Sequence, residues 1–336
     1  MKSDKDTADN PGEILGISGA FWKSLTLHAA VRLGLFTVIG NRGLTGREVS
    51  QQIGGNERGV VTLLNALAGM GLLEKEAGRF RNTSAGALFL VETSPRYVGY
   101  MIRHHANLVD SWGRLDEAVR TGGPVRNRAA EPDGSLEDFL LGMHNNSMGF
   151  APRAVREIPL GGRRKLLDIG GGPGTWSIQF ALANPELSAT VFDLPSTRPY
   201  AEETIGRFDV SERVTFHAGD FTADELPCCY DIAWLSHILH GEGPDTCRGI
   251  VARAVAALEP GGLIMIHDFI LEEDGASPPF PALFSLNMLT GTDGGRSYTK
   301  DELEEMLTAA GVEGVKLLPI QGPTESRIMV GTTGGL

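Results

Sequence analysis

The stretch LLDIGGGPGTWSIQFA, residues Leu166–Ala181, decides the fold. Its apolar start is typical of a buried strand, and the glycines that follow allow a tight turn in which a ligand can approach the backbone. The helical segment after the turn directs its N-terminal amide groups towards that ligand. Strand, glycine-rich turn and helix in this order predict a ligand site at the end of a strand.

Outward from this stretch, strand-like and helix-like segments alternate along the second half of the chain, which predicts a parallel sheet with helices on its faces. The expected strands are 165–169, 188–194, 213–219, 230–236 and 262–270, and the expected helices are 175–185, 196–208, 244–260 and 299–311. Two further strands, VEGVKLLPI and SRIMVGTT, are joined by a short turn and should therefore be antiparallel to each other.

Three acidic residues follow three successive strands. Asp168 precedes the glycines, where its carboxylate would repel a pyrophosphate and attract an ammonium group. Asp193 ends the second strand, at the position that binds ribose hydroxyls in related folds. Asp220 offers an acceptor for an adenine amine, beside the aromatic ring of Phe221. A ligand with an amino acid, a ribose and an adenine fits this order, and S-adenosylmethionine is that ligand.

A nicotinamide-dependent dehydrogenase is the alternative at this point. The pattern from Gly172 through Gly174 to Ser177, with Asp193 about 20 residues on, is close to the dinucleotide fingerprint. The carboxylate of Asp168 next to the glycines counts against it.

The first half of the chain is predicted to be mainly helical. Residues 13–40 have apolar positions at helical spacing, and residues 44–90 contain a short helix, a turn, a second helix and a hairpin around Ala77-Gly78. This is a winged-helix pattern. A ligand-sensing transcription regulator would use the helix around Arg58–Met70, but that helix is too apolar to lie in a DNA groove, so packing or dimerisation is favoured.

The bulk composition excludes several classes of protein. The 336 residues carry a formal net charge of −12, which disfavours nucleic-acid and anionic membrane partners. No apolar run of the length of a spanning helix is evident, and the polar N-terminus lacks the apolar core of a signal peptide. Three cysteines, two of them adjacent, form no disulfide framework, so we expect a cytoplasmic protein.

The segments LLDIGGGPGTWSIQFA, VFDLP, HAGDF, YDIAWLSHILH, ALEPGGLIMIHDFIL and DGGRSYTKDELEEMLTAAG, in this order, resemble the S-adenosylmethionine-dependent O-methyltransferases of the caffeic-acid and acetylserotonin type. The resemblance covers residues 15 to 332. It implies a mainly α winged-helix dimerisation domain over 13–100, a helical linker over 101–160 and an α/β Rossmann-like, seven-stranded class I methyltransferase domain over 161–336. It also implies a homodimer in which the N-terminal helices of each subunit help to close the active site of the other.

The same resemblance assigns the cofactor contacts by position. Asp168, Gly170 and Gly172 would hold the methionine end of S-adenosylmethionine. The ribose and the neighbouring adenine edge would contact Asp193 and Leu194, and the adenine would contact Asp220 and Phe221. Ser236 matches a cofactor-contacting position, and Ser147 matches a helix position that borders the methyl-transfer site.

His240 falls at the position of the family's catalytic histidine, and Asp268 matches an acidic partner of that histidine. We therefore expect His240 to act as a general base on a phenol-like hydroxyl, with Asp268 orienting its ring. Much of the rate should come from aligning the oxygen, the methyl carbon and the sulfur. His237 is expected to have a packing or supporting role, and no metal is expected.

Two departures from the family pattern leave the reaction open. Relatives follow the catalytic histidine with Asp-Trp, where this chain has Gly241-Glu242, and they carry a Glu near the position of Ser297. Methylation of carbon or nitrogen, or loss of transfer, therefore remain alternatives to O-methylation.

The acceptor should be a small, mostly apolar and flat molecule. The segment 280–295 would cover the pocket in this family, together with residues of the middle helices. The candidate lining residues are Trp112, Met143, His144, Phe284, Asn287 and Met288.

Overall fold

The computed structural model describes residues 11–127 and 133–334. Residues 1–10 of the polar N-terminus and residues 128–132 of the expected linker lie outside the described residues. The chain forms two compact units, Met1–Asn107 and Leu108–Leu336.

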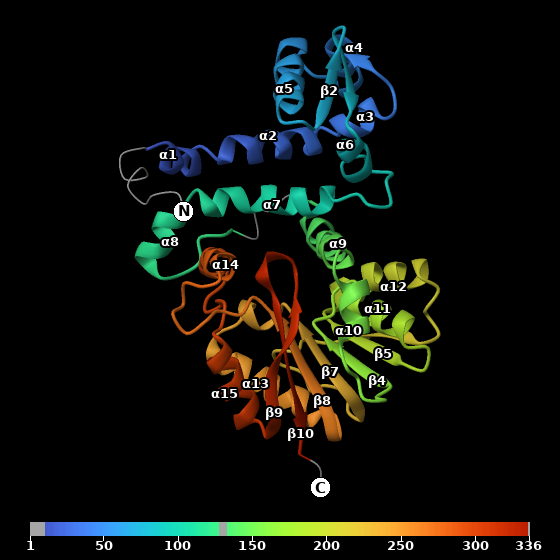
Figure 1. Cartoon of the computed structure of the whole chain (residues 1–336), viewed down its shortest axis with the longest axis vertical. Coiled ribbons are helices and arrows are strands. Elements are labelled where there is room, and N and C mark those ends of the chain that lie inside the picture. The colour runs from blue at the N-terminus through green and yellow to red at the C-terminus, as the bar shows by residue number, and fades with distance from the viewer. Residues whose placement is uncertain (1–10, 128–132, 335–336) are drawn as a thin grey trace, which may run out of the picture. The chain divides into compact units, whose positions relative to one another are not determined.

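The first unit is a small helical domain with a three-stranded sheet, as the winged-helix pattern predicted (Figure 1). Its core gathers the apolar sides of the helices, including Val60, Leu64 and Leu67 of the helix predicted at Arg58–Met70. The hairpin turns at Ala77 and Gly78, both with positive φ, which is the geometry of a type I′ turn. The elements are α1 (Gly12–Ser18), α2 (Phe21–Arg32), α3 (Leu35–Ile39), β1 (Leu44–Thr45), α4 (Gly46–Ile53), α5 (Glu57–Gly69), β2 (Leu73–Glu76), β3 (Arg79–Asn82), α6 (Ser84–Phe89) and the start of α7 (Gly99–Trp112).

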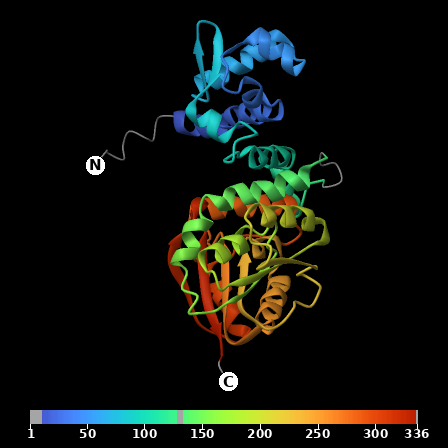
Figure 2. The ribbon, with the colours of Figure 1, turned by 90° about the vertical axis from the view of Figure 1, so that its right-hand side faces the viewer.

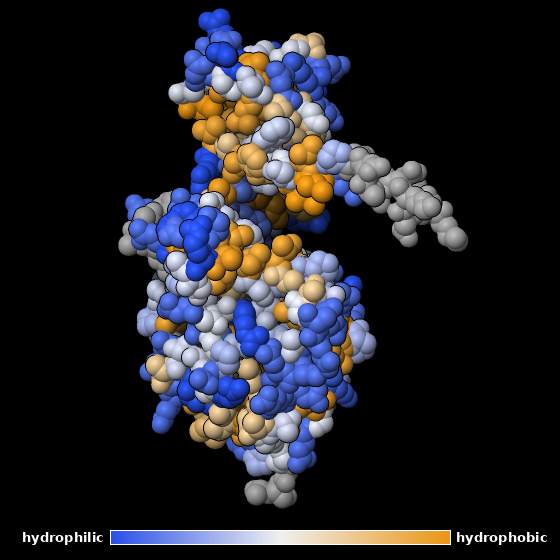
Figure 3. Space-filling model, turned by 90° about the vertical axis from the view of Figure 1, so that its left-hand side faces the viewer, coloured by the Kyte–Doolittle hydropathy of each residue, from blue (hydrophilic) through white to orange (hydrophobic). Residues whose placement is uncertain are grey.

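The first two helices expose large apolar side chains. Ile17 is 79% exposed and Trp22 is 69% exposed, and α1 buries no residue. Hydrophobic residues gather over the helices at the start of the described chain in Figure 3. The stretch Gly12–Arg32 is also long and apolar enough to cross a membrane by length and composition alone, which corrects the expectation that no such stretch exists. That single stretch is weak evidence for a span, because apolar helices of other proteins meet the same criteria.

The second unit is built on a seven-stranded sheet in the order β6-β5-β4-β7-β8-β10-β9 (Figure 1). The five strands from β6 to β8 are parallel to their neighbours, while β10 is antiparallel to both β8 and β9. The strands are β4 (Lys165–Ile169), β5 (Ser188–Asp193), β6 (Val214–Ala218), β7 (Tyr230–Ser236), β8 (Leu258–Asp268), β9 (Val312–Gln321) and β10 (Arg327–Thr333).

Helices cover both faces of this sheet (Figure 2), which explains why its central strands β4, β7 and β8 are apolar on both sides. One core packs α10, α11 and α12 against side chains such as Trp234, and the other packs α13 and α15 against their alternating neighbours, such as Leu235. The helices of this unit are α8 (Leu115–Thr121), α9 (Ser135–Met148), α10 (Ala151–Glu157), α11 (Thr175–Ala183), α12 (Arg198–Arg207), α13 (Pro244–Ala256), α14 (Pro279–Gly291) and α15 (Lys300–Ala309).

The predicted strands and the class of fold are confirmed, and the largest difference in element boundaries lies between α13 and β8. The helix expected over 244–260 ends at Ala256, and β8 begins at Leu258, which pairs with Tyr230 of β7. Pro260 lacks the amide hydrogen that a helix interior requires, so the chain leaves the helix before it.

Candidate active site

The predicted site residues converge at the carboxyl edge of the parallel strands. Asp168 lies at the end of β4, Asp193 at the end of β5 and Ser236 at the end of β7, while Asp268 ends β8. The strand ladder extends slightly beyond these ends, because the amide of Gly170 donates to the carbonyl of Phe192 at 2.8 Å. Ligands bind at this edge in open α/β sheets.

The glycine turn after β4 depends on the absence of side chains. Gly170, Gly172 and Gly174 all have positive φ, at 66°, 55° and 75°. A Cβ added to Gly170 would lie 2.5 Å from Cγ2 of Ile238, so even alanine does not fit there. The turn therefore brings bare backbone to the site, directly before the N-terminus of α11.

Asp168 is fully buried, and its two carboxylate oxygens differ in their surroundings. Oδ2 accepts hydrogen bonds from the hydroxyl of Ser177 at 2.7 Å and from its amide at 3.3 Å. Oδ1 is buried, and no described residue hydrogen-bonds to it. Burial raises the pKa of Asp168 to about 7, although the bonds from Ser177 oppose that shift. A buried carboxylate with one unpartnered oxygen fits the ammonium group of an amino acid ligand.

Asp193 is tied to the same turn. Its Oδ2 accepts from the amide of Gly172 at 2.7 Å, and its Oδ1 accepts from the amide of Leu194 at 2.7 Å and from Thr197. Burial raises the pKa of this carboxyl, and the backbone hydrogen bonds oppose the rise. Oδ1 already accepts two hydrogen bonds, whereas Oδ2 accepts one and keeps a lone pair for a ribose hydroxyl.

Asp220 and Phe221 follow β6, as predicted. The Oδ1 atom of Asp220 accepts from the amide and the hydroxyl of Thr222, which fixes the loop. The ring of Phe221 comes within 3.2 Å of the position that a Cβ on Gly170 would take. The aromatic ring thus lies beside the glycine turn, where an adenine would need an apolar face.

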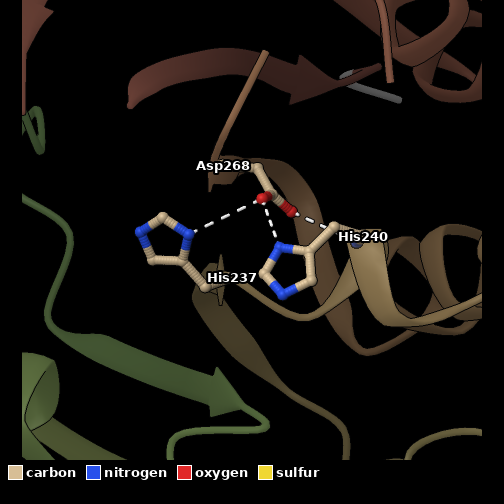
Figure 4. A group of neighbouring side chains, drawn as sticks. All are labelled: His237, His240 and Asp268. Carbon is tan, nitrogen blue, oxygen red and sulfur yellow. Dashed lines mark hydrogen bonds and ion pairs between the residues drawn. The ribbon is translucent and has the colours of Figure 1, made fainter. Parts of the chain in front are cut away.

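His240 and Asp268 form a close pair (Figure 4). Nδ1 of His240 lies 2.6 Å from Oδ1 of Asp268, and the amide of His240 lies 3.4 Å from Oδ2. Burial opposes ionisation of Asp268, but the imidazoles of His240 and His237 outweigh it and hold the pKa of this carboxyl well below its usual range. An ionised Asp268 accepts the Nδ1 hydrogen, so Nε2 is the ring nitrogen left to accept a proton.

Aromatic side chains pack against His240 and form an apolar cluster. The ring of Phe284 lies edge-on at 4.7 Å from His240, and the ring of Phe269 lies parallel to it at 5.9 Å. Phe280 joins them through Phe269, at 5.0 Å. Phe284 was predicted, whereas Phe269 and Phe280 were not. Both could have been predicted from the sequence, since Phe269 follows Asp268 directly and Phe280 lies one helical turn before Phe284.

The remaining predicted lining residues fall into two groups. Trp112 donates from Nε1 to Oδ1 of Asn287 at 2.9 Å, so these two side chains are in contact, and Met288 is the next residue on α14. His144 instead contacts Thr175, the first residue of α11, through Nδ1 at 2.9 Å. Desolvation lowers the pKa of His144 to about 4, so the ring is neutral and ties α9 to the glycine turn. The structure thus places His144 with the predicted cofactor residues.

Two half-buried residues of α9, Met143 and Ser147, are the other predicted members of the site, and they lie on the same helix as His144. The described residues provide no hydrogen bond or ring contact that ties either one to His240. Their roles stay predictions.

A buried histidine that was not predicted supports Ser236. His267 lies 3.0 Å from Oγ of Ser236 through Nδ1 and 3.0 Å from Oγ of Ser326 through Nε2. Burial lowers the pKa of His267 well below its usual value, so the ring is neutral. Asp268, the next residue, was predicted from its match to the family. His267 was not predicted, and its side chain lies on the opposite face of β8 because successive side chains of a strand alternate.

Ser297 has no hydrogen bond to His240 among the described residues. Its hydroxyl donates to the carbonyl of Pro281 at 2.8 Å, and its amide donates to Ser285, so it anchors α14. Gly295, two residues before Ser297, packs against the segment that carries His240, because a Cβ there would lie 2.4 Å from the carbonyl oxygen of His240.

Comparison with known proteins covers both units. Residues 15–92 match the O-methyltransferase dimerisation domain, and residues 118–313 match the O-methyltransferase domain. A 3-hydroxy-5-methyl-1-naphthoate 3-O-methyltransferase of Streptomyces sahachiroi is 34% identical over 96% of this chain and 95% of the relative. The tetracenomycin polyketide synthesis 8-O-methyl transferase TcmO of Streptomyces glaucescens is 34% identical over 93% and 94%. Human N-acetylserotonin methyltransferase in complex with S-adenosylmethionine superposes with a TM-score of 0.85, at 25% identity over 99% of this chain and 100% of the other.

Proposed function

Because this chain belongs to the S-adenosylmethionine-dependent O-methyltransferases, we propose that it methylates a phenolic hydroxyl of a small aromatic acceptor with His240 as the general base. The observation that carries the proposal is the 2.6 Å contact between Nδ1 of His240 and Oδ1 of Asp268, which leaves Nε2 to receive the hydroxyl proton.

S-adenosylmethionine is the methyl donor, as the strand-end acids predicted. In this proposal Asp168 holds the ammonium group, Asp193 the ribose hydroxyls, and Asp220 with Phe221 the adenine. The bound donor supplies an electrophilic methyl group on a positively charged sulfur. The buried, unpartnered oxygen of Asp168 and the bare backbone of the glycine turn support this placement.

His240 deprotonates the acceptor, and Asp268 stabilises the imidazolium that forms. Phe269 and Phe284 hold the imidazole from two sides, which fixes its orientation. A phenol needs this step, because its oxygen is a far better nucleophile once the proton has left. Retention of the pair therefore favours oxygen over carbon or nitrogen as the methylated atom.

The acceptor is a fused-ring phenol. Two of the relatives are named for a hydroxynaphthoate and a tetracenomycin polyketide. The rings of Phe269, Phe280 and Phe284 provide the flat apolar contacts that such a molecule needs. Trp112 and Asn287, joined at 2.9 Å, close a second side of the same pocket in this proposal.

The protein acts as a cytoplasmic homodimer. The exposed apolar side chains of α1 and α2 support this, because they lie within the segment that matches the dimerisation domain.

Incubation with trideuteromethyl-labelled S-adenosylmethionine and a panel of hydroxynaphthoates and larger phenolic polyketides tests the function. We expect at least one phenol to gain the labelled methyl group on oxygen, identified by mass and by its methoxy carbon resonance. Labelled methyl on carbon or nitrogen alone, in a panel that also contains amines, would refute the assignment to a hydroxyl.

A further inference from the structure

Asp268 faces two imidazoles (Figure 4). Nδ1 of His240 lies 2.6 Å from its Oδ1, and Nδ1 of His237 lies 3.6 Å from the same atom. Within residues 11–127 and 133–334, this is the one group of three or more His, Cys, Asp or Glu residues whose ligand atoms all lie within 4.8 Å of one another. The methyl-transfer proposal uses two of the three and leaves His237 without a task.

The backbone holds His237 in an unusual conformation. Its φ is 56°, and its amide donates to the carbonyl of His267 at 2.8 Å, so the turn is fixed where β7 ends. Its ring packs against His267 and Phe269, with centroid separations of 4.4 and 4.5 Å. Left-handed backbone is unfavourable for a residue other than glycine, so the surrounding contacts must offset this strain.

The Nδ1 atom of His237 has no hydrogen-bond partner among the described residues, although it is buried. The separation of 3.6 Å from Asp268 exceeds hydrogen-bonding distance. A buried ring nitrogen without a partner is costly, and this one is aimed at a carboxylate that already faces a second imidazole. A cation between the three groups would provide the missing partner.

We propose that His237, His240 and Asp268 bind a divalent transition-metal ion such as Zn²⁺, and that this ion inhibits methyl transfer. Two imidazole nitrogens and a carboxylate oxygen are a preferred ligand set for zinc. Bonds of about 2.0–2.2 Å in a tetrahedral site place ligand atoms about 3.3 Å apart. The observed separations of 2.6 and 3.6 Å from Asp268 bracket that value, and the ligand atoms all lie within 4.8 Å of one another.

The ion inhibits by reversing the tautomer of His240. In the free protein the ring hydrogen is on Nδ1, where it bonds to Asp268, and the lone pair of Nε2 faces away from Asp268. Zinc bonds to the Nδ1 lone pair, and the hydrogen moves to Nε2, so the ring stays neutral and no proton is released. Nε2 then has no lone pair with which to accept the acceptor's proton. This step rests on the proposed role of His240 as the base.

Calorimetry with ZnCl₂ on the full chain tests the site. Cys228 and Cys229 are exposed thiols that could also bind zinc, so all proteins carry Cys228→Ser and Cys229→Ser. We expect one zinc per chain and binding at least tenfold weaker in the variants His237→Phe and His237→Gln. Equal affinity in both variants would overturn the proposal, as would the absence of binding in the parent. Two substitutions guard against one that fails to fold.

Two further readouts separate the metal site from the catalytic role. Long-range ¹H–¹⁵N spectra of the imidazoles should show the His240 hydrogen moving from Nδ1 to Nε2 when zinc is added. The rate of methyl transfer to a hydroxynaphthoate should fall at least tenfold, recover with a chelator, and be less sensitive to zinc in His237→Phe. Affinity for S-adenosylhomocysteine should not change. A tautomer change without loss of rate would refute both the inhibition and the base, whereas absence of binding would refute only the metal site.

Discussion

Replacement of Asp168 by Asn should stabilise the protein without cofactor and abolish tight cofactor binding. Burial raises the pKa of Asp168 from 3.8 to about 7, a difference of about 3 pH units. At about 1.4 kcal/mol per unit, keeping this carboxylate ionised above pH 7 costs the folded state about 4 kcal/mol. Asn can accept the same two hydrogen bonds from Ser177 through its own oxygen, so the neutral amide avoids most of this cost.

The direction of the pH effect follows from the raised pKa. The folded protein holds this proton at pH values where the unfolded chain has released it. The stability that this provides is fully present below about pH 4 and is lost as the pH rises to about 7. We therefore expect Asp168→Asn to exceed wild type by 2 to 4 kcal/mol at pH 8.5, and by little near pH 4.

Urea unfolding at the two pH values, without cofactor, measures this difference. Asp245→Asn is the matched control, because the side chain of Asp245 is fully exposed, and it should change stability by less than about 1 kcal/mol at either pH. Calorimetry should show binding of S-adenosylhomocysteine at least tenfold weaker in Asp168→Asn, because a charge-assisted hydrogen bond of about 1.5–3 kcal/mol is lost. A variant less stable than wild type at pH 8.5, or one with unchanged cofactor affinity, would refute the reasoning.

Three further predictions concern the turn, the base and the dimer. Gly170→Ala places a methyl group 2.5 Å from Ile238 at positive φ, so calorimetry should show cofactor affinity at least tenfold weaker; unchanged affinity would contradict the role of the turn. Gly295→Ala places a methyl group 2.4 Å from the carbonyl oxygen of His240. Steady-state kinetics should therefore show a fold decrease in kcat that is larger than the fold increase in KM for the cofactor; a larger change in KM than in kcat would contradict this prediction. Trp22→Glu should convert a dimer of twice 35.9 kDa into a monomer in light scattering, whereas a persistent dimer would place the interface elsewhere.

Much of this fold could be predicted from the sequence, because the central parallel strands β4, β7 and β8 are buried on both faces and carry a clear apolar run. The clustering of the acidic residues at successive strand ends could be predicted as well, because parallel strands bring their carboxyl ends to one edge of the sheet. The placement of Asp168 beside the glycine turn could be predicted from the order of residues alone.

The individual side-chain contacts could not be predicted in this way. His144 contacts Thr175 on α11 because of the way in which α9 packs, and sequence spacing does not encode that packing. The hydroxyl of Ser297 turns to Pro281 for a similar reason. His237 resembled an ordinary strand-end residue, and only its positive φ aims its ring at Asp268.

The rate of a single turnover in His240→Ala, measured with saturating S-adenosylmethionine and an acceptor that wild type methylates, tests the central claim most directly. General-base catalysis is typically worth 10² to 10⁴ in rate, so we expect a loss of about that size while affinity for S-adenosylhomocysteine stays within threefold of wild type. A transfer rate within tenfold of wild type, in a variant that still binds the cofactor, would show that another group removes the proton.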